Sequence, residues 1–409
     1  MSGAGEVLGG GLGQPGGDHA LPFKGNEATV RIELEPIIGL RHWLHAHPEL
    51  SRHETNTAQY LRQFLQDHAR PDGILDLDGA GFAAIYDGAA PGRTVLLRCE
   101  LDALPIHEVN EDIAYRSVYD GVGHKCGHDG HMAILAGVAQ SLADRPARGR
   151  VVLLFQPDEE TGSGARQCRA HENFALIEPD CVFALHNLPG YPKGQVICRA
   201  GAFSSQVKYA AVHLSGREAH SAQPETGASP SFALARLMLE APGIQAKYER
   251  PDSYALVVPV FTQMGVPASG ICPAKGEAHF TLRAPDGATV EAMWSDLATA
   301  ARELAAEYGL EVEFETREEF AATANGQMSH DMIREAAGRC GLDFTSLDRP
   351  FRWGEDFGEL TRHHEGAMFG LGAGLDRPDL HNPDYDYPDD ILESGIAMFS
   401  ELISIALSR

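Results

Sequence analysis

The chain has 409 residues, of which 43% are hydrophobic and 22% are charged, and this is typical of a soluble globular protein with two domains, or one domain carrying a large insertion. The formal net charge of −25 argues against nucleic acid as a partner. Seven cysteines, an odd number, argue against a disulfide framework, and we see neither a signal-peptide pattern nor a run of about twenty apolar residues, so we expect a cytoplasmic protein without a membrane span.

The chain begins with a glycine-rich segment and continues with two predicted helices. Residues 1–26 are non-periodic and rich in glycine, so we expect this segment to be flexible. Apolar residues at helical spacing predict helices over residues 31–45 and 54–68. Pro48 lies between them and disfavours helix in the residue before it, so the first helix should end there.

Three short apolar strands follow, at residues 94–98, 151–155 and 181–185. Each is nearly continuous in apolar residues, which is typical of strands buried on both faces of a parallel sheet. Helical patterns at residues 129–142 and 164–176 alternate with them, and this order predicts a parallel α/β sheet. Ligands bind such sheets at the carboxyl ends of the strands. Four polar residues follow the strands there: Asp102, Glu159, Glu160 and His186.

A change of pattern near residue 201 predicts an inserted domain over residues 203–317. Strands of alternating polarity at 207–214, 255–263, 275–283 and 310–315, with helices at 229–240 and 289–308, predict a small α+β sandwich. The main domain resumes with a helix at 327–340, a buried strand at 367–371 and a last helix at 389–407. The predicted fold is an α/β main domain, residues 27–202 and 318–409, with a mainly parallel sheet and helices on both faces, interrupted by the α+β domain.

Residues 123–131, with the sequence GHKCGHDGH, form the clearest candidate for a metal-binding loop. Cys126 and His128 are one glycine apart and can face one cation, because thiolate and imidazole both bind divalent metals such as Zn²⁺, Mn²⁺, Ni²⁺ or Co²⁺. The adjacent Glu159 and Glu160 can divide two roles, one binding a metal and the other moving a proton. The alternative for the loop is a surface turn with scattered histidines, and the alternative for the glutamate pair is an exposed helix start.

Three further histidines carry weaker signals. His186 follows a predicted strand, His381 lies in a loop rich in proline and asparagine, and His220 lies in the inserted domain. A single histidine is more often a surface residue or a satisfied core residue than a ligand, so position alone leaves both interpretations open for each.

Short motifs along almost the whole chain resemble the M20 metallopeptidase family, in the amidohydrolase branch that includes aminoacylases, hippurate hydrolases and hydrolases of auxin–amino acid conjugates. The matching stretches occur in the family's order, at residues 44–50, 98–105, 124–131, 155–160, 185–186, 219–220, 355–357 and 380–383. The resemblance implies a homodimer formed through the inserted lid domain, and two divalent metal ions per subunit, with zinc, manganese, nickel and cobalt not distinguished.

The resemblance also implies a role for each matching residue. Glu159 would act as general base and then as general acid, and Asp102 would steady a metal ligand. The partner subunit's His220 would reach the carbonyl oxygen of the substrate. Five residues would hold the metals: Cys126, His128, Glu160, His186 and His381. The implied reaction is hydrolysis of the amide bond of a small N-acyl-amino acid.

Two positions depart from the family pattern. Glu100 stands where an aspartate is common, and we expect this change to alter packing more than chemistry. Gly270 stands where the lid commonly has an asparagine that helps to bind substrate. Arg283 remains a candidate for the contact with the substrate carboxylate, and an exposed strand arginine is an equally good interpretation.

Two other functions compete with the N-acyl-amino-acid hydrolase. A dipeptidase or exopeptidase would use the same metals but would need an acidic contact for a free amine, which we cannot place in the sequence. A catalytically silent binding protein would keep the fold without the chemistry, yet every expected ligand and Glu159 are present.

Overall fold

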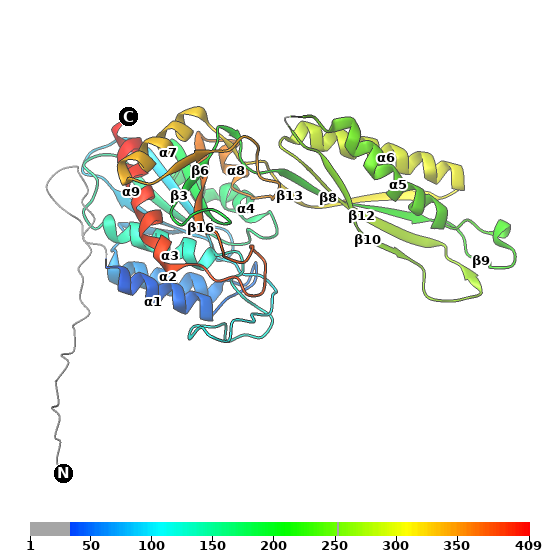
Figure 1. The fold of residues 1–409 in the computed structure, drawn as a ribbon, viewed down its shortest axis with the longest axis horizontal. Coiled ribbons are helices and arrows are strands. Elements are labelled where there is room, and N and C mark those ends of the chain that lie inside the picture. The colour runs from blue at the N-terminus through cyan, green and yellow to red at the C-terminus, as the bar shows by residue number, and fades with distance from the viewer. Residues whose placement is uncertain (1–32, 252) are drawn as a thin grey trace, which may run out of the picture.

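The computed structural model of this protein describes residues 33–251 and 253–409, and it has a larger and a smaller body (Figure 1). The larger body is built on an eight-stranded sheet and the smaller body on a four-stranded sheet. The glycine-rich segment predicted at residues 1–26 and the start of the helix predicted from residue 31 lie outside the described residues.

The central strands of the larger sheet are parallel. Its order is β1 (Gly73–Asp76), β2 (Phe82–Asp87), β4 (Arg150–Gln156), β3 (Thr94–Glu100), β5 (Cys181–Pro189), β16 (Gly366–Gly374), β6 (Val196–Cys198) and β15 (Phe344–Ser346). The run β4-β3-β5-β16 is parallel throughout, while β1 and β2 pair antiparallel at one edge. The mainly parallel sheet expected from the sequence is therefore confirmed, and the carboxyl ends of its central strands share one edge.

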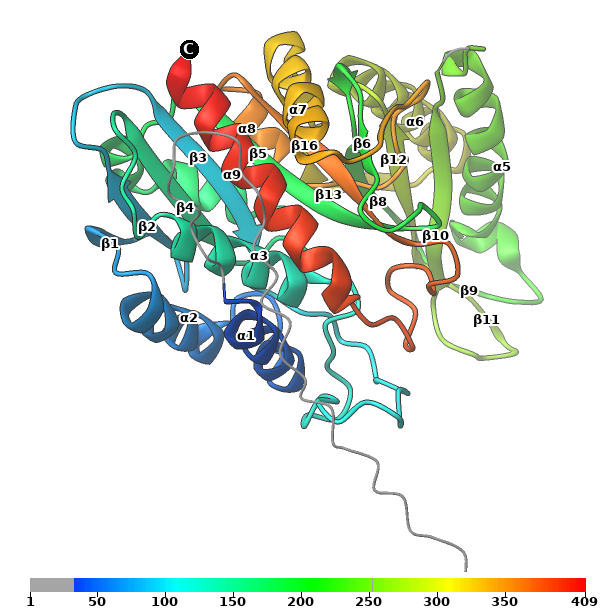
Figure 2. The same cartoon turned by 60° about the vertical axis from the view of Figure 1, so that its left-hand side comes forward.

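Helices cover both faces of this sheet, as predicted. One face packs against α1 (Leu34–Ala46), α2 (Thr55–His68), α3 (His128–Ser141), α7 (Gln327–Cys340) and α9 (Leu392–Ser408). The other packs against α4 (Gly164–Ala170), the 3-10 helix η1 (Glu172–Leu176) and the short α8 (Gly358–Thr361). Figure 2 shows α3, α7 and α9 lying across the first face. This arrangement buries the strands on both sides, which explains their continuous apolar runs.

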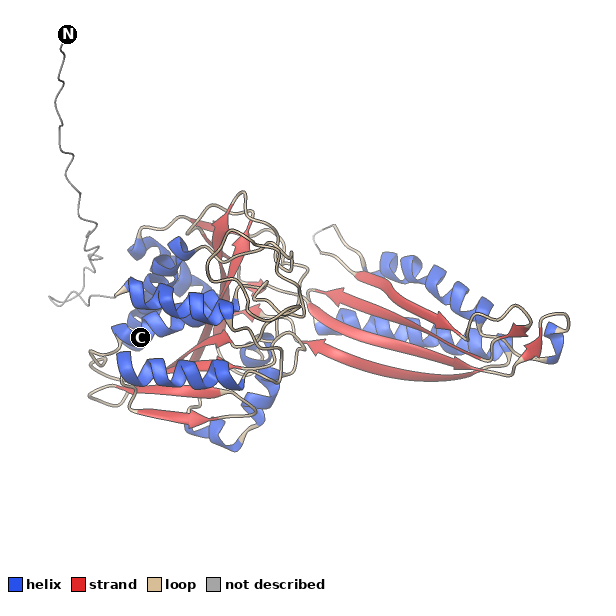
Figure 3. Ribbon diagram, turned by 90° about the horizontal axis from the view of Figure 1, so that it is seen from below, coloured by secondary structure: helices blue, strands red, loops and turns tan. Residues whose placement is uncertain are grey.

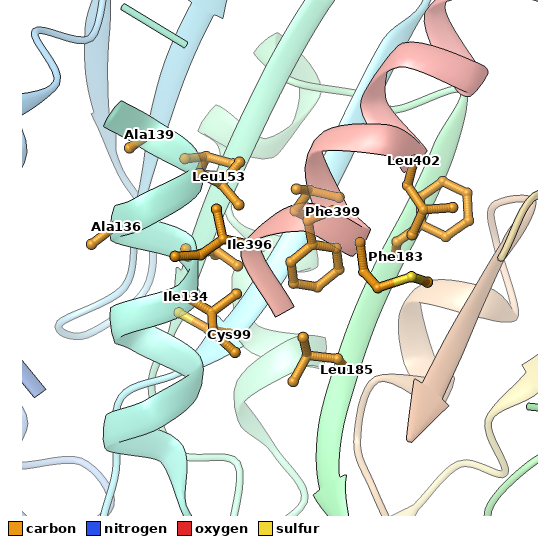
Figure 4. Close-up of a cluster of buried hydrophobic side chains, with 14 of the residues drawn as sticks. Cys99, Ile134, Ala136, Ala139, Leu153, Phe183, Leu185, Ile396, Phe399 and Leu402 are labelled. Atoms are coloured by element: carbon orange, nitrogen blue, oxygen red, sulfur yellow. The ribbon is translucent and has the colours of Figure 1, made fainter. Parts of the chain in front are cut away.

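The core between α3, α9 and the sheet is closely packed (Figure 4). Ile134 of α3 and Ile396 of α9 meet there above the strands. A Cβ atom added at Gly137 would lie 2.3 Å from Ile396, and one added at Gly395 would lie 2.3 Å from Ile134, so glycine is what lets the two helices approach. Within the described residues, Asp389–Ser408 is the one stretch long and apolar enough to cross a membrane, and 61% of its most apolar 18 residues are buried inside the protein.

The smaller body is an antiparallel sheet with two helices on one face (Figure 3). Its strand order is β10 (Leu256–Met264), β12 (Lys275–Ala284), β8 (Gln206–Ser215) and β13 (Glu311–Phe320), and the helices are α5 (Ser231–Tyr248) and α6 (Gly287–Tyr308). Asp286 caps α6 by accepting from the Thr289 N–H at 2.8 Å, and Gly309, with φ 65°, ends it. These elements enclose a hydrophobic core of their own.

Two small pairings mark the ends of the smaller body. Where the chain enters and leaves it, β7 (Gly201–Ala202) pairs with β14 (Ala324–Asn325). At its other end, far from the larger sheet, β9 (Ala219–His220) pairs with β11 (Ile271–Cys272) beside the 3-10 turn η2 (Pro224–Thr226) (Figure 1). A last 3-10 turn, η3 (Asp389–Ile391), leads into α9.

Candidate metal centre

The expected site residues of the larger body gather at the carboxyl edge of its sheet. Asp102 follows β3, and Glu159 and Glu160 follow β4. His186 lies inside β5, which continues to Pro189, and not after its end as predicted. His128 is the first residue of α3. The helix begins there because Gly127 has φ 96°, and a Cβ at this position would lie 2.6 Å from the Asn187 side chain.

The donor atoms of these residues face one another. The Sγ of Cys126 lies 3.5 Å from the Nε2 of His186. The Oε1 of Glu160 lies 4.0 Å from the Nε2 of His128 and 3.7 Å from the Nε2 of His381. Two overlapping triplets that share Cys126 have their donor atoms within 4.8 Å of one another: Cys126, His128 and His186, and Cys126, Glu160 and His381. The residues expected to bind metal are thus brought together.

Hydrogen bonds made by Nδ1 turn the Nε2 atoms of two histidines toward the other donor atoms. The Nδ1 of His128 donates to the backbone carbonyl of Asp102 at 2.9 Å, and that of His186 donates to the carbonyl of Asn187 at 2.9 Å. Such outer contacts fix the tautomer and the ring orientation of a metal ligand. The Asp102 carboxylate lies 3.4 Å from the same His128 Nδ1 and accepts from the Glu160 N–H at 3.0 Å. It is thus placed to orient a ligand.

The residues present fit a group of bound cations. The Nε2 of His128 and the Oε1 of Glu160 are buried and have no hydrogen-bond partner. Burial raises the pKa of Glu160 to about 7, and burial together with the nearby carboxylates raises the pKa of the Cys126 thiol well above its usual range. A thiolate and carboxylates crowded in this way need positive charge to ionise together, and divalent cations supply it.

Glu159 and Glu160 differ in their surroundings. Both lie 4.0 Å from the His128 Nε2, but only Glu160 also approaches His381. Burial, together with the charges of Glu355 and Glu160, raises the pKa of Glu159 well above its usual range. Glu159 lines the same cavity and groups with His128 and Glu160, but it lies outside the two triplets around Cys126.

All of these donors except His128 line a cavity of about 550 Å³ between the larger sheet and the base of the smaller one. Arg283 of β12 and Phe320 of β13 reach it from the smaller body. Arg283 is thus a cavity residue and not merely an exposed strand arginine, and burial lowers its pKa. Sequence reasoning missed the aromatic wall of the cavity, which no motif signalled: Tyr191, Phe351 and Trp353.

The structure does not bring His220 to this cavity. His220 is exposed in β9, at the end of the smaller body that lies far from the larger sheet (Figure 1). It pairs with Ile271, next to Gly270, whose carbonyl accepts from the Ser221 N–H at 3.0 Å. The two lid positions of the family pattern therefore lie together, and a role for the partner subunit's His220 stays a prediction.

Glu100 belongs to a buried charge network beneath the site. Its carboxylate pairs with Arg98 and lies 2.7 Å from the Nδ1 of His131. The Nη2 of Arg98 lies 2.9 Å from Glu355 and 2.6 Å from Asp356. The signal for this network was an arginine at the end of an otherwise apolar strand. Paired in this way, buried charges hold the strand ends that carry the site in register.

A second network, around His45, predicts how stability depends on pH. Burial alone would lower the pKa of His45, but hydrogen bonds at 2.9 Å to Asp129 and to Glu108 raise it to about 9. Because the pKa of His45 is higher in the folded than in the unfolded protein, the protonated imidazole stabilises the fold. This stabilisation is fully present below the unfolded pKa of about 6.5 and is lost as pH rises to about 9. We expect wild-type protein to lose roughly 3 kcal/mol over this range through His45.

Urea unfolding of the wild type and of His45→Gln at several pH values between 6 and 10 measures this contribution. The variant should be less stable at pH 6 and should lack the component lost between about 6.5 and 9. Unfolding free energies that run parallel in the two proteins would show that His45 is not the titrating group.

Comparisons with known proteins agree with this geometry. The chain is 28% identical over 377 residues to N-acetyl-L-cysteine deacetylase of Bacillus subtilis, covering 90% of this chain and 88% of that protein. It is 26% identical over 376 residues to N-acetyldiaminopimelate deacetylase of Bacillus licheniformis, covering 91% and 99%.

Solved structures show the same fold. The structure matches a putative aminohydrolase from methicillin-resistant Staphylococcus aureus with a TM-score of 0.84 at 23% identity, covering 93% of this chain and 98% of that one. It matches the Bacillus subtilis YXEP protein, described as a dinuclear metal-binding peptidase of the M20 family, with a TM-score of 0.78 at 27% identity, covering 92% and 98%. The model of peptidase family M20/M25/M40 matches residues 96–405, most of the sequence, so this chain belongs to that family.

Proposed function

We propose that this protein is a metal-dependent amidohydrolase that cleaves the amide bond of small N-acyl-amino acids. The observation that carries the proposal is the grouping of five metal-ligand side chains beside one cavity that four of them line, next to Glu159, which lies outside the two triplets around Cys126. The names of the related deacetylases support an N-acyl-amino acid as the substrate class. Two divalent cations per subunit would be held by Cys126, His128, Glu160, His186 and His381.

The chain's own side chains divide the work of hydrolysis. When bound, the cations would supply Lewis acidity, which polarises the carbonyl group and makes water a better nucleophile. Glu159 takes the proton of the attacking water and delivers it to the amine that departs. Arg283, which faces the cavity, binds the carboxylate of the amino acid. Trp353 and Phe351 offer an apolar wall to the acyl group.

A substrate panel tests this function against its alternatives. Protein loaded with Zn²⁺, Mn²⁺, Ni²⁺ or Co²⁺ would be assayed with N-acetyl- and N-benzoyl-amino acids and with dipeptides that carry a free amine. We expect hydrolysis of the N-acyl compounds. Faster turnover of the dipeptides would indicate a dipeptidase of the same fold. A protein that neither holds metal nor hydrolyses any member of the panel would be a catalytically silent binding protein.

We also propose that the smaller body is a lid through which two subunits form a homodimer. Its strand β10 lies at the edge of the sheet, where its backbone groups can pair with another chain. Apolar side chains are exposed along this strand, among them Val260 and Phe261, and Phe232 and Leu239 are exposed on α5.

The seven cysteines are free, which fits the reducing cytoplasm as the location.

The dimer proposal makes a sharp prediction about His220. His220→Ala should lose most activity, because the partner subunit's His220 would contact the substrate carbonyl. Co-expression of His220→Ala with Glu159→Gln should restore about a quarter of wild-type activity, because half of randomly formed dimers contain one complete site of two. Activity per purified dimer measures this.

A matched pair provides the control for this mixing experiment. Glu159→Gln mixed with Glu160→Gln should restore nothing, since both changes damage the site in their own subunit. If the His220→Ala mixture is no more active than its parents, the histidine does not act across the dimer. If His220→Ala alone is fully active, the histidine has no catalytic part.

A further inference from the structure

The open face of the smaller sheet carries a second cluster of metal-ligand side chains, outside the cavity described above. On β8, Val212 and Leu214 point to the helices, so His213 between them points to the opposite face. Glu277 of β12 lies directly across from His213 in the antiparallel register, and His279 follows two residues later on the same face. Two strands therefore place an imidazole, a carboxylate and an imidazole side by side.

The donor atoms of this cluster lie at distances suited to one cation. The Oε2 of Glu277 is 2.9 Å from the Nδ1 of His213 and 3.4 Å from the Nε2 of His279. All three residues offer donor atoms within 4.8 Å of one another. Bonds of about 2.0 Å at tetrahedral angles place the ligands of a zinc ion roughly 3.3 Å apart, so small side-chain movements would complete such a site.

His279 carries the observation that points to a bound ion. Its ring centroid lies 4.9 Å from that of Phe261, the residue is only 8% exposed, and its Nε2 is buried without a hydrogen-bond partner. The other ring nitrogen, Nδ1, is hydrogen-bonded to the hydroxyl of Tyr209. A histidine that donates through Nδ1 presents the lone pair of Nε2, and this lone pair faces Glu277.

The remaining contacts of His213 agree with a ligand role. Its Nε2 lies 3.6 Å from the Oε2 of Glu315 on β13, so a carboxylate faces the ring nitrogen that would not bind the ion. His213 and Glu277 also line a cavity of about 580 Å³ together with Glu313. This cavity gives an ion and its water a path to the cluster.

We propose that His213, Glu277 and His279 bind a divalent cation of the zinc type, with water as the fourth ligand, as a site separate from the candidate metal centre. Two neutral imidazoles and one carboxylate suit Zn²⁺, and the ion would cross-link β8 to β12 on the face that the helices leave uncovered. The site does not depend on the proposed hydrolase activity, because none of its three residues lines the cavity at the larger sheet.

Metal counting on the full-length protein tests the site. Wild type and His213→Ala/His279→Ala would be saturated with Zn²⁺, desalted and measured for zinc per chain. We expect the double variant to hold one equivalent less while its hydrolysis per chain stays within twofold of wild type. In a Cys126→Ala background, expected to lose the candidate centre, one equivalent should remain and should vanish when His279→Ala is added.

Two controls keep the outcome decisive. Glu313→Gln removes a carboxylate from the same cavity without touching the three ligands, and it should bind as much zinc as wild type. Glu277→Gln keeps the size of the side chain and should lose the same equivalent of zinc. It provides the test in case the double variant fails to fold. Equal zinc in wild type and in folded variants that lack His279 or the Glu277 carboxylate would overturn the proposal and leave an ion-pair network.

Discussion

Replacing Glu159 by glutamine should abolish most turnover while leaving the bound metal in place. The amide is nearly the same size as the carboxylate but cannot accept a proton from water, so the general base and the general acid are lost together. We expect kcat to fall about 10³-fold to 10⁴-fold, the upper part of the range for such catalysts. Steady-state kinetics and metal analysis of one preparation measure both effects.

The neighbouring glutamate is the matched control for this experiment. Glu160→Gln is the same change one residue along the chain, but the Oε1 of Glu160 lies near both His128 and His381. This variant should therefore lose metal as well as activity. If Glu159→Gln stays active, Glu159 is not the general base. If it loses metal while Glu160→Gln keeps it, the two roles have been assigned the wrong way round.

The order of the main elements was predictable from sequence because burial leaves a strong pattern there. The strands β3, β4 and β5 are covered on both faces, so their apolar runs are continuous and hard to mistake. The short edge strands β1 and β15 are only partly buried and leave no such run, and we did not predict them. Their existence depends on pairing with a neighbour.

Helix ends were predicted less well, because packing overrides local rules. The helix predicted over residues 164–176 breaks into α4 and η1 at His171, which has extended backbone and accepts from the Asn173 N–H. The helix predicted to end at residue 240 continues past Pro242 to Tyr248, since Ala241 packs into the smaller core and Tyr248 against it. Proline favours the end of a helix, but tertiary contacts decide whether the helix stops there.

The candidate site likewise contains residues that the sequence pattern could place and residues that only the folded chain places. Residues that follow parallel strands had to meet, and Asp102 after β3 does accept from the N–H of Glu160 after β4 at 3.0 Å. Trp353 and Phe351 lie in a loop without periodicity, and only the folded chain places them against the cavity. His220 marks a further limit, because a contribution from a second subunit leaves no trace within one chain.

Replacing Cys126 by alanine should remove the metal from the candidate centre, and with it the activity. Cys126 is the residue shared by both donor triplets, and its Sγ lies 3.5 Å from the His186 Nε2, so its loss affects the binding of both ions. Metal content should fall by more than half, and activity should become undetectable unless metal is added in large excess. Elemental analysis and kinetics over a metal titration measure the two effects.

Cys168→Ala separates a lost ligand from a lost buried side chain. Cys168 is also a free cysteine with no exposed surface, but it packs in the core under the opposite face of the sheet. Its truncation should cost stability of about 1 kcal/mol and leave metal content unchanged, because a small cavity is all that it creates. Equal metal content in the Cys126→Ala and Cys168→Ala proteins would contradict the ligand role of Cys126. Because the Cys126 Sγ belongs to both donor triplets, we expect a lower unfolding midpoint in both variants but loss of metal only in Cys126→Ala.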